Sequence, residues 1–225
     1  MAKKNLQQED AQLENVSEAI STTSQWIERN SNVITWCLAA VIVVVIGLIS
    51  LNNYVIRPKA LEASNENAKA VAYFMQGEWE KALKGDEAEC LGFEEIADSY
   101  SSFQQGELAA LYAGICHYQL GNYEEAAHFL RKFSADDLVI DPAARMLLGD
   151  AYVQMDELDK AAKAFMSAAA SKNEIIAPIA LKKAGFVFMA QDNRKAAHRV
   201  FVEIRDNYPA SSEASDADKY IALTE

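Results

Sequence analysis

The chain has few of the residues that catalytic and metal sites use. Its 225 residues include three histidines, His117, His128 and His198, and none has a partner at ligand spacing. It also lacks a glycine-rich phosphate loop and a Gly-x-Ser-x-Gly elbow. We therefore expect no metal, no cofactor and no enzymatic activity, and we place His128 and His198 on the solvated surface.

Cysteine, proline and glycine are also scarce. Three cysteines are too few for a disulfide framework, and Cys37 lies in an apolar run where it acts as a small hydrophobe. Cys90 and Cys116 either pair in an oxidising compartment or remain two independent buried thiols. Four prolines and nine glycines exclude collagen-like and disordered compositions, so the chain should fold.

Positively charged residues are outnumbered: the chain has 21 Lys and Arg against 33 Asp and Glu, which gives a net charge of -12. An acidic body repels nucleic acid and anionic lipid headgroups, so we expect neither as a partner. The acidity has a second, simpler interpretation, which is that it only keeps the protein soluble.

A single long apolar run spans residues 33–51. Its 19 residues carry no charge and include twelve Val, Ile or Leu. As a helix it covers roughly the 30 Å hydrocarbon thickness of a bilayer, and those twelve side chains contribute on the order of -4 to -7 kcal/mol towards insertion. The acidic head of about 32 residues is unlike a signal peptide, so the run is predicted to be an uncleaved transmembrane anchor.

Positive charges near the run favour a cytoplasmic body, because Arg29 precedes it whereas Arg57, Lys59 and Lys69 follow it. This rule is a bias, and long C-terminal domains can be translocated regardless of charge. The tail before the run has apolar residues at helical spacing and is either a short amphipathic helix or a partly helical tail, with Leu13, Val16, Ile20 and Ile27 on its apolar side.

After the anchor, one pattern of small and large residues occurs three times. Gly114, Gly149 and Gly185 are 35 and 36 residues apart, and each is followed twelve residues later by an alanine and sixteen residues later by a leucine or phenylalanine, namely Ala126, Ala161 and Ala197 and then Leu130, Phe165 and Phe201. Small residues at matched positions let two helices cross closely, and the larger residue fills the remaining space. The pattern predicts an all-α helical-repeat solenoid.

Flanking segments complete this predicted solenoid. Residues 61–83 read as one helix, followed by a degenerate first repeat with about seven extra residues around 85–90 that form a loop or a broken helix. Ser211 or Ser212 can cap a last helix over 213–223. The predicted parts are a tail (1–32), a transmembrane helix (33–51), a connecting helix with the degenerate repeat (52–106), three repeats (107–209) and a capping helix (210–225).

The repeat residues resemble the tetratricopeptide repeat (TPR) family. Leu148-Gly149, Tyr152, Ala161 and Phe165 match its signature at the family's spacing, although its leading Trp is absent. Together with the anchor, Leu83-Lys84-Gly85-Asp86 and Leu91-Gly92-Phe93 resemble single-span repeat proteins of the YfgM type, particularly those of Bacteroidota. That resemblance implies a cytoplasmic N-terminus, a periplasmic repeat domain at the inner membrane, and partnership with Sec translocon subunits, a membrane-anchored periplasmic chaperone and exported polypeptides.

The first helix of each pair is expected to line the inner face of the solenoid. Spacing of 3, 4 and 3 residues selects a groove stripe on each of these helices. The stripes are Leu108, Leu111, Ile115 and Tyr118; Ala143, Met146, Asp150 and Val153; and Ile179, Lys182, Phe186 and Met189. Most members are large and apolar, and Lys182 is the one cation, so a hydrophobic segment or amphipathic helix suits this protein-binding groove better than a carboxylate. Alternatively, the stripes bury themselves against the helix over 61–83 or in a dimer.

These features lead to a membrane-anchored TPR scaffold that binds proteins or peptides at the Sec translocon and assists their handover with periplasmic chaperones. An alternative is a structural adaptor subunit of another envelope complex, in secretion or division. The charge count favours a third hypothesis, a cytoplasmic scaffold of opposite topology.

Overall fold

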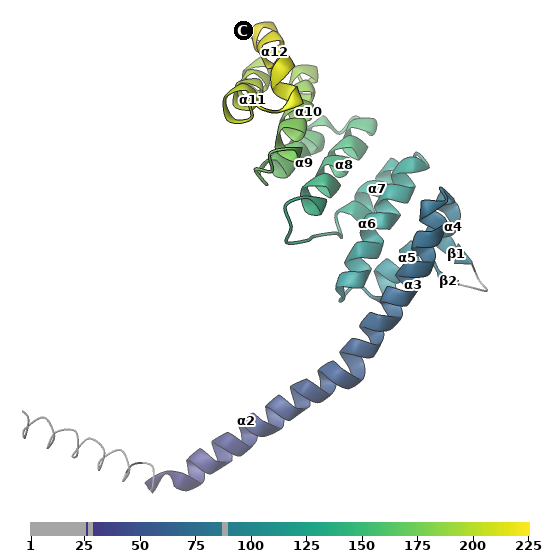
Figure 1. Cartoon of the computed structure of the whole chain (residues 1–225), viewed down its shortest axis with the longest axis vertical. Helices are drawn as coiled ribbons and strands as arrows, with labels where there is room; N and C mark the ends of the chain where they lie inside the picture. Colours follow the sequence, from purple (N-terminus) through teal and green to yellow (C-terminus); the bar gives the residue numbers. More distant parts are fainter. Residues whose placement is uncertain (1–25, 27–28, 87–89) are drawn as a thin grey trace, which may run out of the picture. The chain divides into compact units, whose positions relative to one another are not determined.

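The computed structural model describes residue 26, residues 29–86 and residues 90–225. It divides into two compact units, residues 1–58 and residues 59–225. Figure 1 colours the chain from purple at the anchor to yellow at the C-terminus. The amphipathic tail predicted around Leu13 and Ile27 lies outside the described residues.

The first unit contains the predicted span. Helix α2, Ser31–Leu51, has no charged residue, and its apolar side chains are exposed throughout the described part. A five-residue π-helical segment, η1 (Asn52–Ile56), follows it. Pro58 comes next, and its ring and missing N–H disturb the α-helical bonding of the turn before it, which a widened turn relieves. Within the described residues, this region holds one helix long and apolar enough to cross a membrane.

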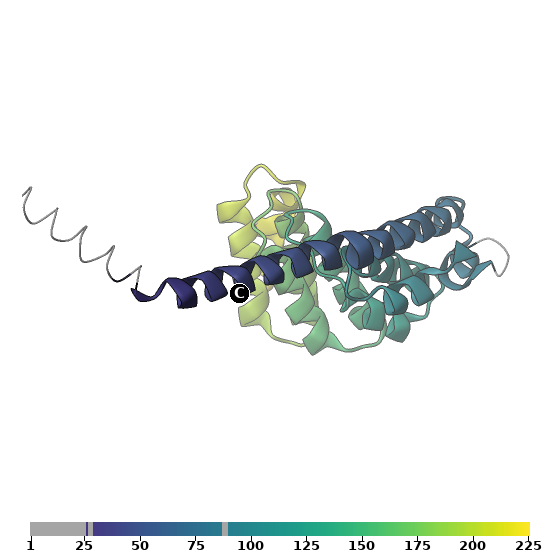
Figure 2. The same ribbon diagram turned by 90° about the horizontal axis from the view of Figure 1, so that it is seen from below.

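The second unit is built of helix pairs joined by short turns, which the two views of Figures 1 and 2 show following one another along the chain. The pairs are α3 (Arg57–Met75) with α4 (Trp79–Lys84) and α5 (Phe93–Ser99); α6 (Gln104–Gln119) with α7 (Tyr123–Leu130); α8 (Ile140–Gln154) with α9 (Leu158–Ala169); and α10 (Ile176–Ala190) with α11 (Arg194–Asn207). A 3-10 turn, η2 (Ser212–Asp216), and α12 (Ala217–Leu223) end the chain.

The repeated glycines make the close helix crossings that the sequence predicts. A Cβ atom added to Gly149 would lie 2.5 Å from Cε1 of Phe165, and one on Gly185 would lie 2.5 Å from Cζ of Phe201. Both distances are far shorter than van der Waals contact, so glycine is required where each ring packs on the facing helix. Both phenylalanines are almost fully buried. The predicted solenoid packing is confirmed.

The same type of turn joins the two helices in each pair. The turns contain a residue with positive φ at equivalent places, Gly77, Gly121, Asp156 and Asp192. In each turn the next residue donates its backbone N–H to a carbonyl five residues back, as Asn122 does to His117 at 2.9 Å. This bond satisfies a carbonyl at the end of the first helix and reverses the chain.

The first repeat differs from its predicted form. The single helix expected over residues 61–83 is wrong, because α3 ends at Met75 and the turn containing Gly77 separates it from α4. The second helix of this repeat is then interrupted by a hairpin, in which β1 (Gly85–Asp86) pairs antiparallel with β2 (Cys90–Leu91). The extra residues therefore break a helix, which was one of the two predicted outcomes.

The C-terminal end of the solenoid is covered by α12. The Ser211 hydroxyl accepts a hydrogen bond from the backbone N–H of Ala214 at 3.2 Å and so caps η2, whereas the single helix predicted over 213–223 is divided into η2 and α12. Tyr220 stacks on Phe201 with ring centroids 5.0 Å apart, and Ile221 is buried in the same cluster. The last repeat thus buries its outer face in its own chain.

Candidate protein-binding groove

The predicted groove stripes lie on α6, α8 and α10, the first helices of three pairs. Leu108 is 37% exposed, Val153 38% and Phe186 42%, so each stripe offers one open apolar residue. Leu111 is 8% exposed and packs with Leu130 and Ala144, which places it in the core rather than on a binding surface. The other members are half-buried, namely Ile115, Tyr118, Ala143, Met146, Asp150, Ile179, Lys182 and Met189. Their binding role stays a prediction.

The stripe on α10 is partly occupied by the chain itself. Phe186 packs edge-on against Tyr220 of α12, with ring centroids 5.1 Å apart. Lys182 Nζ lies 3.5 Å from an Asp216 carboxylate oxygen. At this end the covering elements are η2 and α12, which neither predicted form of self-burial had named.

The stripe on α8 contains a charge pair that its sequence pattern did not indicate. Both carboxylate oxygens of Asp150 accept hydrogen bonds from Lys183 Nζ, at 2.6 and 2.8 Å. The pKa of Tyr118, on α6 in the preceding pair, is raised by burial and then by the nearby Asp150 charge. The ion pair between Asp150 and Lys183 therefore links two repeats, and the Asp150 carboxylate is already paired within the chain.

A fourth stripe exists on α3, and sequence reasoning missed it. Ala70 and Ala82, both fully buried, are twelve residues apart and match the Gly114 and Ala126 pair of the next repeat. Counting back from Ala70 with the spacing used for the other stripes selects Ser64, Asn67, Val71 and Phe74. The same alanine spacing would have revealed this stripe from sequence.

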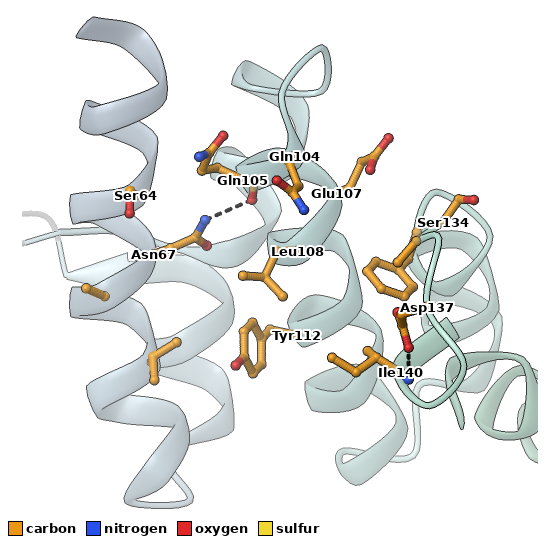
Figure 3. Close-up of a pocket in the computed structure, with 14 residues that line it drawn as sticks. Ser64, Asn67, Gln104, Gln105, Glu107, Leu108, Tyr112, Ser134, Asp137 and Ile140 are labelled. Atoms are coloured by element: carbon orange, nitrogen blue, oxygen red, sulfur yellow. Dashed lines mark hydrogen bonds between the residues drawn. The ribbon is translucent and has the colours of Figure 1, made fainter. Parts of the chain in front are cut away.

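A pocket of about 530 Å³ lies between the stripes of α3 and α6, and the segment joining α7 to α8 forms its third wall (Figure 3). Its walls carry both apolar and polar groups. The residues that line it are Ser64, Asn67, Ala68, Val71, Gln104, Gln105, Glu107, Leu108, Tyr112, Phe133, Ser134, Ala135, Asp137 and Ile140. Three members of the α3 stripe meet Leu108 here, and Leu108 is the one predicted groove residue that lines the pocket.

Packing and hydrogen bonds fix the pocket walls. Tyr112 packs against both Phe74 and Phe93, whose ring centroids lie 4.9 and 5.0 Å from its own. Asn67 Nδ2 donates to the backbone carbonyl of Gln105 at 2.8 Å, which joins α3 to α6. These contacts hold the two stripes at a fixed distance, so the pocket is preformed.

The third wall is ordered by Asp137, whose carboxylate accepts hydrogen bonds from the backbone N–H groups of Val139 and Ile140. These bonds lower the pKa of Asp137, so the group is anionic at neutral pH. Asn173, in the next inter-repeat segment, donates to the carbonyl of Leu138 at 3.0 Å. Leu138, Val139 and Ile140 are nevertheless exposed, and Ile140 is the one of the three that lines the pocket.

The histidines are placed differently from one another. His128 is exposed as predicted, whereas His198 is half-buried, with Nδ1 3.3 Å from Thr224 Oγ1. His117 is buried, stacks on Phe129 and has Nε2 3.0 Å from a Glu94 carboxylate oxygen. Within the described residues, no three His, Cys, Asp or Glu side chains converge as a metal site.

The cysteines are free thiols in the structure. Cys116 is fully buried, and burial raises the pKa of its thiol to about 12. Cys90 is half-buried on β2. Two independent thiols were one of the two predicted states of Cys90 and Cys116.

The helix pairs, their turns and their glycine contacts define a tetratricopeptide helical-repeat fold, the class predicted from the sequence. A profile of the tetratricopeptide repeat family matches residues 108–136, which include most of α6 and all of α7. Such folds serve as scaffolds for protein–protein interaction, which agrees with a groove of apolar and polar side chains. No curated protein matches the chain.

Among solved structures, the chain is similar to the crystal structure of MamA, with a TM-score of 0.50 and 17% sequence identity. The match covers 69% of this chain and 91% of the MamA chain. At that identity the likeness concerns the fold alone.

Proposed function

We propose that the protein is a membrane-anchored TPR scaffold that binds polypeptides through the groove on α3, α6, α8 and α10. The observation that carries the proposal is the preformed pocket between the stripes of α3 and α6, with Leu108 open to solvent beside it. The uncharged and exposed α2 supports anchoring, because its apolar surface has no partner within the described residues.

We further propose that the repeats lie in the periplasm and act beside the Sec translocon with a membrane-anchored chaperone. The support for this part is the resemblance of the sequence to YfgM-type proteins. The charges at Arg57, Lys59 and Lys69 favour the opposite orientation, so topology needs its own measurement. Protease treatment of spheroplasts should degrade the repeat domain if it is periplasmic, and its protection would overturn this placement.

Tethering explains how a shallow groove can function. A scaffold held in the membrane meets clients at a raised effective concentration, so weak binding suffices. Leu108, Val153 and Phe186 offer only part of their surface each, which fits transient handover rather than a permanent complex.

Site-specific photocrosslinking in membranes tests the proposal. A photoreactive residue at Leu108 or Val153 should capture exported chains together with translocon or chaperone subunits. The control position is Lys163, an exposed residue on α9, the second helix of its pair. Capture at Lys163 equal to that at Leu108 would overturn binding through the groove.

The same experiment separates the alternative. A structural adaptor of a secretion or division complex would crosslink to one dominant stoichiometric partner outside the export pathway. If no translocon or chaperone subunit is crosslinked at any groove position, the proposed role in protein export is overturned.

A further inference from the structure

The charged side chains that line the pocket between α3 and α6 are all acidic. Glu107 and Asp137 are the charged residues among those that line it, and no lysine or arginine is included. Asp137 is held anionic by backbone N–H groups, and Glu107 forms no ion pair within the described residues. An occupant with positive charge beside its apolar part would therefore be attracted, and one with negative charge repelled.

The pocket also contains an unsatisfied hydrogen-bond acceptor. Asn67 is 5% exposed, and its Nδ2 is used by the Gln105 carbonyl, which fixes the direction of the amide. Its Oδ1 is buried and accepts no hydrogen bond in the structure. A buried acceptor without a donor is costly, and a ligand that supplies the donor recovers that cost.

The donor best suited to Asn67 is a backbone N–H of an extended segment. A helix uses its backbone N–H groups internally beyond the first turn, whereas an extended chain presents them outward. Figure 3 shows Leu108 and Gln104 beside the Asn67 amide. Both side chains are exposed, so they can change rotamer and let a segment approach the buried oxygen of Asn67 while the helices that form the pocket stay in place.

We propose that this pocket binds an extended apolar polypeptide segment that carries lysine or arginine at one end. Its apolar side chains contact Val71, Leu108, Tyr112 and Phe133, one backbone N–H donates to Asn67 Oδ1, and its positive end faces Glu107 and Asp137. This inference rests on the proposed scaffold function and names the class of segment that the groove accepts.

Fluorescence anisotropy with the full chain in detergent micelles tests the charge preference. The probes are two labelled eight-residue peptides rich in Val and Thr, one with two lysines at its end and one with two glutamates. The lysine peptide should bind more tightly, and Glu107→Gln should weaken it about two- to fivefold while leaving the glutamate peptide unweakened. The matched control is Glu124→Gln, an exposed acid on α7.

The acceptor is tested by methylating single backbone nitrogens of the lysine peptide. One position should weaken binding by roughly tenfold, the loss expected for a buried acceptor left without its donor. In Asn67→Ala the unmethylated lysine peptide should still bind, more weakly, and methylation at that position should weaken it no further, which a general steric defect would not reproduce. An equal loss in both proteins would overturn the assigned hydrogen bond.

The location is tested by comparing Leu108→Gln with Val153→Gln, after circular dichroism has shown that both variants keep the helical content of the parent protein. Loss of binding in Leu108→Gln alone supports the pocket. Loss in Val153→Gln alone overturns the inference and leaves the scaffold function intact. Failure of both peptides to bind also overturns the inference. The scaffold function is judged separately by the crosslinking experiment, and it fails as well if Leu108 and Val153 capture no more than the control position Lys163.

Discussion

Replacing Gly149 with alanine tests the contact that repeats along the solenoid. The new Cβ would lie 2.5 Å from Cε1 and 2.7 Å from Cδ1 of Phe165. The Phe165 ring is 1% exposed and is enclosed by the alanines of its own cluster, so it cannot swing away without moving other helices. The substitution should therefore destabilise the protein although alanine favours helix formation.

The size of the effect follows from two opposed contributions. Overpacking a close-packed interior costs about 1–3 kcal/mol. Replacing a helical glycine by alanine returns about 1 kcal/mol. We expect a net loss of about 1–2 kcal/mol in the free energy of unfolding, since the clash involves several ring atoms.

The assay is urea unfolding of the full chain in detergent, followed by circular dichroism at 222 nm. With a denaturant slope of about 2 kcal/mol/M, the midpoint should fall by about 0.5–1 M. Gly47→Ala is the control, because no atom lies within 4 Å of its added Cβ. The midpoint should not fall in this variant.

A second substitution separates the clash from other causes. Phe165→Ala removes every atom that the new Cβ would meet and should cost about 3–5 kcal/mol alone. In the double variant the clash is gone, so it should be more stable than the sum of the two changes by about 0.5–3 kcal/mol. Strict additivity, or a higher midpoint in Gly149→Ala alone, would refute the packing argument.

Three further predictions follow from the structure. Burial lowers the pKa of His117 below its ordinary 6.5, despite the opposing charge of Glu94. The unfolded chain therefore binds more protons than the folded one, and the stability of the protein should fall as pH drops below about 6.5. Urea midpoints measured from pH 7.5 to 5 should show a smaller loss in His117→Gln. Gly121 has a φ of +80°, which β-branched residues avoid, whereas Asp156 occupies the matching position of another turn. Gly121→Asp should therefore have a free energy of unfolding about 1 kcal/mol higher than Gly121→Val, which thermal unfolding of the two variants measures. The thiol pKa of Cys116 is raised to about 12, so this residue should resist iodoacetamide at pH 8 in the folded protein and react after unfolding. Peptide mass spectrometry that finds Cys116 alkylated in the folded protein would contradict its burial.

The three clear repeats were predictable because their packing is local. Gly149 and Phe165 lie on helices of the same pair, so the spacing between them in the sequence records a direct contact. The first repeat was predicted only in a degenerate form, and its helix boundaries were missed, because the hairpin of β1 and β2 is inserted into its second helix. That insertion displaces Phe93 from the expected spacing, although Ala70 and Ala82 keep theirs.

The groove was predicted only in part, because exposure depends on neighbouring elements. Leu111 and Leu108 belong to the same helical stripe, yet Leu111 packs under Ala144 of the next repeat whereas Leu108 remains open. Phe186 fits the stripe equally well, but Tyr220 from the C-terminal helix lies against it. No spacing within one helix contains this information.

The sequence by itself determined the repeat period, the close helix crossings and the apolar run that is a candidate span. Each depends on residues a few turns apart, where helical geometry fixes the distance. Only the tertiary structure decided that Asn67, Leu108 and Ile140 line one pocket, that its charged lining residues are acidic, and that Asn67 Oδ1 has no donor. Those properties arise where three segments meet in space, and hydrogen bonds between them, such as Asn67 to Gln105, set the geometry.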